Sequence, residues 1–121
     1  MEMHRDNTSP IKIQSVTSGE ITVNHQKYTS SIQLSLNNPP MPWRPTCADD
    51  ITADDLVQLT TTNPEIILIG TGDKHLQLSP KILQSLYQYK IGFEIMSTIA
   101  ACRTFTLLAS DQRNILAAVI I

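Results

Sequence analysis

The chain has 121 residues, of which 41% are hydrophobic and 17% are charged, and its formal net charge is -2. This length and composition predict one globular domain over residues 1–121 that can build a core without a metal ion or a disulfide scaffold. The basic residues form no run and only 5% of residues are aromatic, which argues against a nucleic acid partner. No apolar run approaches the ~18 residues of a membrane span, and the polar amino terminus lacks the apolar segment of a secretory signal. We therefore expect a soluble cytoplasmic protein.

The amino-terminal third of the chain alternates apolar and polar residues, which is typical of half-buried strands. Residues 1–10 are polar and are expected to be frayed. Strands are predicted at 11–16, 21–23 and 28–36. Because their connections are short, we expect them to form an antiparallel β-meander with one solvated face.

A proline-rich loop follows at residues 37–45, which hold four of the seven prolines. Proline fixes φ and has no backbone N–H, so this loop is predicted to be neither a helix nor a central strand. Trp43 lies within it. We expect Trp43 to close one end of the core with its indole N–H bonded to a carbonyl, and the alternative is a ligand platform.

A short helix is predicted after the loop, with Thr52 as its N-cap and Asn63-Pro64 at its end. Asp54 and Asp55 fall in its first turn, where negative charge interacts favourably with the helix dipole. Together with Asp49 and Asp50 they could suggest a metal cluster. Capping and a solvated face explain these carboxylates better, because the spacing of a calcium loop is absent.

From residue 64 onward, strands and helices alternate, which predicts a mainly parallel sheet with right-handed crossovers. Buried strands are predicted at 66–69 and 93–96, and an apolar, central strand at 115–121. One helix begins at Ser79-Pro80, ends at Gly92 and includes Leu86 and Tyr87 in its buried stripe. The other begins at Ser97 or Thr98.

A family resemblance rests mainly on three stretches of this second half. They are Pro-Glu-Ile-Ile-Leu-Ile-Gly-Thr-Gly at 64–72, Ile-Gly-Phe-Glu-Ile-Met at 91–96 and Ala-Ala-Cys-Arg-Thr-Phe at 100–105, with Leu107, Leu108, Arg113, the closing apolar strand and Trp43 in its loop. On these motifs the chain resembles a family of unknown function. That family occurs in small bacterial and archaeal proteins, in the human adipogenesis-associated Mth-type domain protein and in a mitochondrial complex I assembly factor.

The resemblance implies a three-layer α/β fold with a mixed, five-stranded central sheet whose last strand is antiparallel to the rest. It implies no established reaction, and the best understood members act in the assembly of a larger protein complex. Two departures are visible: Phe105-Thr106 stands where the family commonly has Tyr-Asn, and Asp111-Gln112 where it often has Glu-Gly. A function carried by that Tyr hydroxyl or Asn amide would be missing here.

The exit from the strand at 66–69 supplies the first candidate ligand residues, Gly70, Thr71, Gly72 and Asp73. Glycines there let backbone N–H groups approach an anion. The stretch completes no phosphate-loop pattern, and His75 stands where a dinucleotide fingerprint needs its third glycine. The simpler interpretation of the two glycines is a tight strand exit.

Cys102 and Arg103 lie early in the last helix, so we expect them to face the same crevice as the Gly-Thr-Gly turn. Arg103 can clamp a carboxylate or phosphate, or it can pair with Glu94 or Asp73 and pin the helix to the sheet. Cys102 can act as an activated thiolate if a base such as His75 assists it. A small buried thiol is the ordinary interpretation.

The three histidines and two cysteines show no ligand spacing, so we expect no metal and no cofactor. No catalytic set is complete, so no residue is assigned a catalytic role. The sequence favours a non-enzymatic factor that binds a protein partner or assists complex assembly. The alternative is an anionic-ligand binding protein or enzyme that uses the crevice near Gly70–Asp73, Cys102 and Arg103. A homo-oligomer that covers an apolar surface at the proline-rich loop is a third hypothesis.

Overall fold

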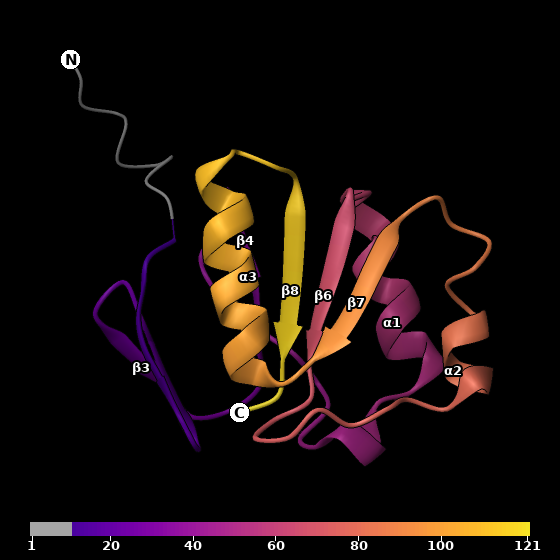
Figure 1. The fold of residues 1–121 in the computed structure, drawn as a ribbon, viewed down its shortest axis with the longest axis horizontal. Coiled ribbons are helices and arrows are strands. Elements are labelled where there is room, and N and C mark those ends of the chain that lie inside the picture. Colours follow the sequence, from indigo (N-terminus) through magenta and orange to yellow (C-terminus); the bar gives the residue numbers. More distant parts are fainter. Residues whose placement is uncertain (1–10) are drawn as a thin grey trace.

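The structure is a computed structural model that describes residues 11–121, so the expected fraying of residues 1–10 lies outside the described part. Within this range eight strands form two sheets, and helices cover both faces of the larger sheet (Figure 1). The strands are β1 (Ile13–Thr17), β2 (Glu20–Val23), β3 (Gln26–Tyr28), β4 (Ile32–Ser35), β5 (Met41–Pro42), β6 (Ile66–Gly70), β7 (Gly92–Met96) and β8 (Ile115–Val119). The helices are α1 (Ala53–Leu59), α2 (Pro80–Gln84) and α3 (Thr98–Ser110), with 3-10 turns η2 (Ala48–Asp50) and η3 (Thr60–Thr62).

The small sheet contains β1, β2 and β3 in that order, and both of its pairings are antiparallel, so the predicted meander is confirmed. The third predicted strand, 28–36, is wrong in one respect. The chain leaves the small sheet after Tyr28, and β4 pairs with β8 in the larger sheet. The alternation of apolar and polar residues on both sides of this break indicates that one face of each strand is buried. It does not indicate which sheet a strand joins.

The larger sheet has the order β5-β4-β8-β6-β7, so β8 is central as expected and the mixed five-stranded sheet is confirmed. β8 runs parallel to β6 and antiparallel to β4. The expectation that the last strand is antiparallel to the rest is therefore wrong, because the strand of opposite direction beside β8 is β4. The connections from β6 to β7 and from β7 to β8 are crossovers, and each crossover returns the chain to the same end of the sheet.

The larger sheet separates two cores. On one face Leu68, Ala117 and Val119 pack with Phe105 of α3 and with Ile21 of the small sheet. On the other face the core contains residues of α1, α2 and the proline-rich loop; its members include Trp43, Leu56, Ile67, Leu86 and Ala118. This arrangement confirms the three layers. It also explains why β6 and β8 are apolar throughout, because both faces of each strand are covered.

Two predicted elements differ from the structure. Among the strands of residues 11–121, β7 lies at the edge of the sheet and pairs with β6 alone, and Glu94 is exposed, so the predicted third buried strand is only partly covered. α2 ends at Gln84, and the chain after it forms turns in which an N–H donates to the carbonyl three residues earlier. Leu86 N–H, for example, donates to Leu83 O. Tyr87 is consequently 67% exposed, while Leu86 is buried as expected. A hydrophobic stripe does not distinguish an α-helix from such a series of turns.

Candidate functional site

The exit of β6 packs directly against the start of α3. A Cβ added to Gly70 would lie 2.9 Å from Thr98 Cα, 2.9 Å from Thr98 Oγ1 and 2.9 Å from Val119 Cγ1. Gly72 has a φ of +99°, which an L side chain rarely adopts. The first glycine therefore permits close packing, and the second permits the turn, as the strand-exit interpretation requires.

The backbone groups of this turn are bonded within the fold. Thr71 N–H donates to Met96 O at 2.9 Å, and Gly72 N–H donates to Thr98 Oγ1 at 2.9 Å. Thr98 N–H donates in turn to Gly72 O, and its hydroxyl donates to Ile120 O at 2.6 Å. The buried Thr98 hydroxyl thus links the exits of β6 and β8 to the first turn of α3. The buried Thr71 hydroxyl bonds Met96 O at 3.2 Å and links the exit of β6 to that of β7. Sequence reasoning assigned Thr98 only a potential N-cap role, and the N-cap is Ser97.

The structure separates the other candidate residues. Asp73 Oδ2 accepts a hydrogen bond of 2.8 Å from Ser18 Oγ. Cys102 belongs to α3 and is buried in the core, and burial raises the pKa of its thiol to about 12. Arg103 is exposed and pairs with no acidic residue among residues 11–121, so the predicted pairing with Glu94 or Asp73 is wrong.

A pocket of about 180 Å³ lies near this end of the sheet and is lined by His75, Gln77, Leu78, Leu83 and Ile95. It contains none of the six predicted ligand residues. The structure thus brings Gly70, Thr71 and Gly72 together around Thr98, and it places the Cys102 thiol inside the core. Ligand binding by the predicted set stays a prediction.

Trp43 is buried in the core on the α1 side, as expected. The prediction that its indole N–H bonds a carbonyl is wrong, because Trp43 Nε1 has no hydrogen-bond partner within the described residues. The neighbouring Ser31 Oγ is also buried without a described partner, although Trp43 N–H bonds Ser31 O at 2.9 Å.

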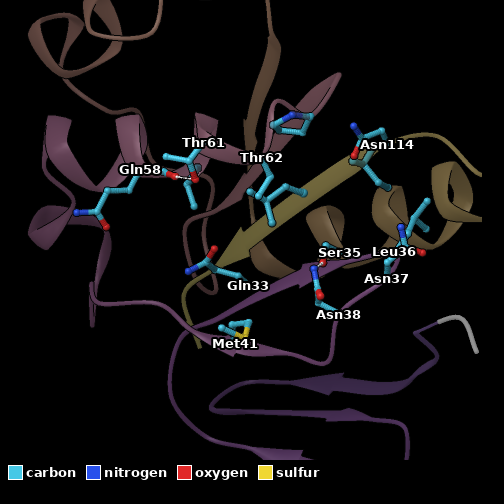
Figure 2. A pocket seen from close by; sticks show the side chains of 14 residues that line it. Gln33, Ser35, Leu36, Asn37, Asn38, Met41, Gln58, Thr61, Thr62 and Asn114 are labelled. Carbon is cyan, nitrogen blue, oxygen red and sulfur yellow. Dashed lines mark hydrogen bonds between the residues drawn. The ribbon is translucent and has the colours of Figure 1, made fainter. Parts of the chain in front are cut away.

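A larger pocket, with a volume of about 560 Å³, lies at the opposite end of the parallel strands. It occupies the α1 side of the sheet beside β4, where Ile32 and Leu34 face the other core and Gln33 and Ser35 line the pocket. The end of α1 and η3 form one side, and the loop after β4 forms the other (Figure 2). We call this pocket the amide groove.

The lining of the amide groove is polar but uncharged. Five carboxamide side chains line it: Gln33, Asn37, Asn38, Gln58 and Asn114. No Asp, Glu, Lys, Arg or His is among its lining residues within 11–121. Figure 2 shows Gln33 between Gln58 on one side and Asn38 on the other. Sequence reasoning missed this site, because its residues come from separate segments and polar amides in loops are ordinary.

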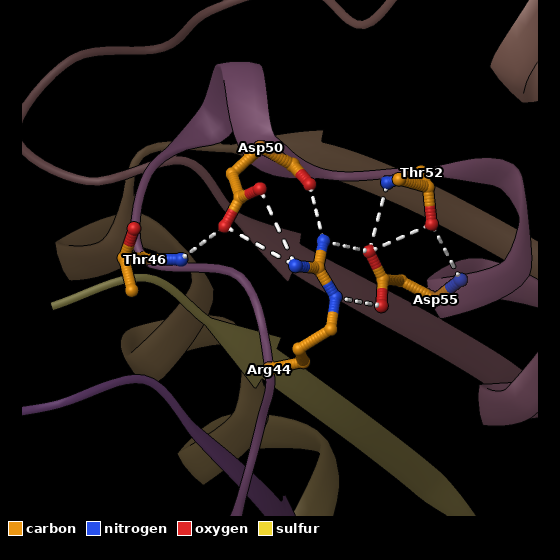
Figure 3. A network of polar contacts seen from close by, with 5 residues as sticks. All are labelled: Arg44, Thr46, Asp50, Thr52 and Asp55. Carbon is orange, nitrogen blue, oxygen red and sulfur yellow. Dashed lines mark hydrogen bonds and ion pairs between the residues drawn. The ribbon is translucent and has the colours of Figure 1, made fainter.

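A second polar cluster fixes the proline-rich loop to α1 (Figure 3). The guanidinium of Arg44 donates to both carboxylate oxygens of Asp55, Nε to Oδ1 at 2.8 Å and Nη2 to Oδ2 at 2.7 Å. It also contacts the Asp50 carboxylate at 3.3 Å. Asp55 in addition accepts from Thr52 N–H at 2.8 Å and forms a capping box with it. We call these residues the Arg44 clamp.

The electrostatics of the clamp follow from this geometry. The hydrogen bonds from Arg44, aided by those from Thr52, hold the pKa of Asp55 at about 2, against an ordinary value of 3.8. The same bonds raise the pKa of Arg44 above its ordinary value. Asp55 therefore remains a carboxylate throughout the physiological range, and its role is that of a cap and an ion-pair partner. The sequence predicted the cap and missed Arg44.

Within residues 11–121, no group of three or more His, Cys, Asp and Glu side chains is placed to hold a metal ion. The helices among residues 11–121 are all too short or too polar to span a bilayer.

Comparison with known proteins places these features in a family. Residues 13–120 match the family described as protein of unknown function (DUF498/DUF598). The NADH dehydrogenase (ubiquinone) 1 alpha subcomplex assembly factor 3 of Xenopus tropicalis is 28% identical over 120 residues, which cover 98% of this chain and 65% of that protein. A 13 kDa major membrane protein of Francisella tularensis is 28% identical over 109 residues, which cover 88% of each chain. The chain thus spans less than two thirds of the length of the assembly factor.

Solved structures agree with the family. The crystal structure of a protein from Bordetella parapertussis has a TM-score of 0.87 and 30% identity, and the match covers 93% of this chain and 97% of that one. The solution structure of a Bordetella pertussis protein, described as a Mth938-like domain, has a TM-score of 0.79 and 26% identity over 99% of this chain and 92% of that one. The predicted resemblance to an Mth-type domain and to a complex I assembly factor is confirmed. The chain belongs to the DUF498/DUF598 family of proteins of unknown function.

Proposed function

We propose that this chain is a protein-binding domain that acts in the assembly of a larger protein complex and does not itself turn over a substrate. The observation that carries the proposal is the match to a complex I assembly factor, which extends over 98% of this chain. That protein is longer than this chain, so its partners do not transfer by similarity. The proposal therefore concerns the type of activity and leaves the identity of the complex to experiment.

The ionisable groups with shifted pKa values support a non-enzymatic role. The Arg44 clamp uses Asp55 to fasten a loop to a helix. The Cys102 thiol, with its pKa raised to about 12 by burial, stays protonated and is unsuited to nucleophilic attack. The pKa shifts of Asp55 and Cys102 therefore have structural causes, an ion pair and burial in the core. In a catalytic site, groups with shifted pKa values lie together in a cleft.

Deletion of the gene in its host tests the proposal. Native complexes from the deletion strain and the parent would be separated by size and quantified by mass spectrometry. We expect at least one multi-subunit complex to decrease severalfold while its subunits accumulate in smaller species, and the wild-type gene should restore it. An unchanged set of complexes would contradict the proposal.

The proposal places the chain in the cytoplasm, which the two unpaired thiols Cys47 and Cys102 support because reducing compartments keep cysteines free. Self-association also stays a prediction, and light scattering at high concentration measures it directly.

Anion binding or catalysis by Gly70–Asp73, Cys102 and Arg103 is the alternative function. The exposed guanidinium of Arg103 suits such a role. Thermal-shift screening with phosphates, nucleotides and carboxylates measures binding. A substrate turnover that Arg103→Ala abolishes would overturn the non-enzymatic proposal.

A further inference from the structure

The amide groove offers hydrogen-bonding groups that the fold leaves unused. Gln33 Nε2 donates to Pro42 O at 3.0 Å, and Asn114 Nδ2 donates to Asn63 O at 3.3 Å. Among residues 11–121, the side-chain carbonyl oxygens of both residues receive no donor, and the Gln58 carboxamide makes no hydrogen bond. A carboxamide presents a donor and an acceptor side by side, as a peptide group does. These side chains are therefore matched to a ligand that contains peptide groups.

The backbone beside the groove is open as well. β5 pairs with β4 at only two positions, Ile32 with Pro42 and Gln33 with Met41. The chain between them includes Pro39 and Pro40, which have no N–H to donate. Within the described part of the chain, residues 36–38 make no backbone–backbone hydrogen bond. Such unpaired peptide groups next to a sheet are what an added extended segment uses for main-chain pairing.

The charge distribution restricts the ligand further. The groove has no charged lining residue in the described range, and the two charged residues that flank its lining segments, Glu65 and Arg113, pair with each other at 3.1 Å. A charged side chain that entered the groove would lose its water without gaining an opposite charge. The groove therefore discriminates against charged segments, and its six apolar lining residues, among them Leu59, Pro64 and Leu116, suit small apolar side chains.

We propose that the amide groove binds an extended, uncharged segment of a partner polypeptide. This inference rests on the proposed function and assigns it a surface. The segment pairs through its peptide groups with the carboxamides of Gln33, Gln58 and Asn114 and with the open backbone at 36–38. A volume of about 560 Å³ is within the usual range of ligand sites and accommodates a few residues of chain.

The test uses the whole chain and a phage-displayed library of random decapeptides as the probe. Enriched peptides would be synthesised with blocked termini and a fluorophore, and their affinities measured by fluorescence anisotropy. Gln58→Lys introduces a charge at an exposed groove position. Gln84→Lys makes the same change at an exposed position on α2 outside the groove and is the matched control.

We expect the enriched peptides to share a stretch without Asp, Glu, Lys or Arg. We expect Gln58→Lys to weaken binding at least about tenfold and Gln84→Lys to change it less than about twofold. The inference is overturned if no peptide is enriched, if the shared stretch is charged, or if both variants bind as the wild type does. The side-chain amide NMR signals of Gln33 and Gln58 provide a further test with maltoheptaose, a neutral oligosaccharide. The inference is equally overturned if maltoheptaose shifts these signals and none of the peptides does.

Failure of this inference can be separated from failure of the proposed function. If the deletion strain loses a complex that Gln58→Lys restores as well as the wild type, the assembly function stands and the groove is not its surface. If peptides bind the groove but deletion changes no complex, the inference about the groove is supported and the proposed assembly function is contradicted.

Discussion

Arg44 holds Asp55 through two parallel hydrogen bonds of 2.8 and 2.7 Å, and this contact joins the proline-rich loop to the first turn of α1. The two side chains differ in environment, since the Arg44 side chain is 54% exposed and that of Asp55 is 7% exposed. Asp55 thus lies largely out of water and depends on Arg44 and Thr52 for its partners. A buried carboxylate in this situation stabilises the fold only while its partners are present.

Removal of the Asp55 carboxylate should destabilise the protein. We expect Asp55→Ala to lower the free energy of unfolding by about 2 kcal/mol, because it removes the Asp55 side of the capping box and the ion pair with Arg44 together. Asp54→Ala, at the exposed neighbouring position, should change it by no more than about 0.5 kcal/mol. Urea denaturation measures both values, and equal effects of the two substitutions would show that the clamp does not contribute.

Acid should weaken the same clamp over a defined range. The folded pKa of Asp55, about 2, lies below its ordinary value of 3.8, so the unfolded chain binds the proton first. The stabilisation is therefore complete above pH ~5 and is lost as the pH falls from about 4 through about 2, by at most about 2 kcal/mol. Urea midpoints measured from pH 5 to pH 2 should fall less steeply in Asp55→Asn. An identical slope in the variant argues against a depressed Asp55 pKa.

Substitution of either glycine at the β6 exit by alanine should lower the stability of the protein, and the physical reason differs between the two positions. Gly70→Ala places a Cβ 2.9 Å from backbone and side-chain atoms, and we expect a loss of about 1–3 kcal/mol from overpacking. Gly72→Ala has room, since the nearest atom is at 3.9 Å, but its φ of +99° should cost about 1–2 kcal/mol of strain. Gly92→Ala on the β7 edge has neither problem and should change stability by less than about 0.5 kcal/mol. If all three variants unfold at the same denaturant concentration, this account of the turn is wrong.

The two cysteines should differ in reactivity. Cys47 is exposed, whereas Cys102 is buried and its pKa is raised to about 12. We expect a thiol reagent such as DTNB to modify one thiol per native chain and two in denaturant, with Cys47→Ser abolishing the native reaction. Rapid native modification of Cys102 would instead revive the activated-thiolate hypothesis.

The sequence predicted the strands and helix caps whose signals are local. Thr52, Ser79 and Ser97 all cap helices, and the apolar run at 66–69 is a strand covered on both faces. Strand–helix alternation predicted the parallel pairing of β6 with β7 and β8. The sequence did not predict that β4 joins the larger sheet, and the direction that the family resemblance implied for β8 is wrong. Both depend on pairing between segments far apart in the chain, which the alternation of apolar and polar residues does not encode.

The candidate site was predicted less well for the same reason. Gly70 and Gly72 were recognised by residue type, but their close partner Thr98 carries no signal in the sequence. Cys102 was expected to face the crevice, whereas it lies in the core, so the ordinary interpretation of a small buried thiol is confirmed. The amide groove combines residues from 33 to 116, and only the folded sheet brings them together.

Photo-crosslinking in the living host tests the proposal that this domain binds a protein partner through the amide groove. Benzoylphenylalanine would be incorporated at position 58 in the groove and, as the control, at position 84 on α2. We predict that irradiation joins position 58, and not position 84, to one defined polypeptide through an uncharged stretch identified by mass spectrometry. Adducts of equal yield from both positions, or none from position 58, would contradict the claim.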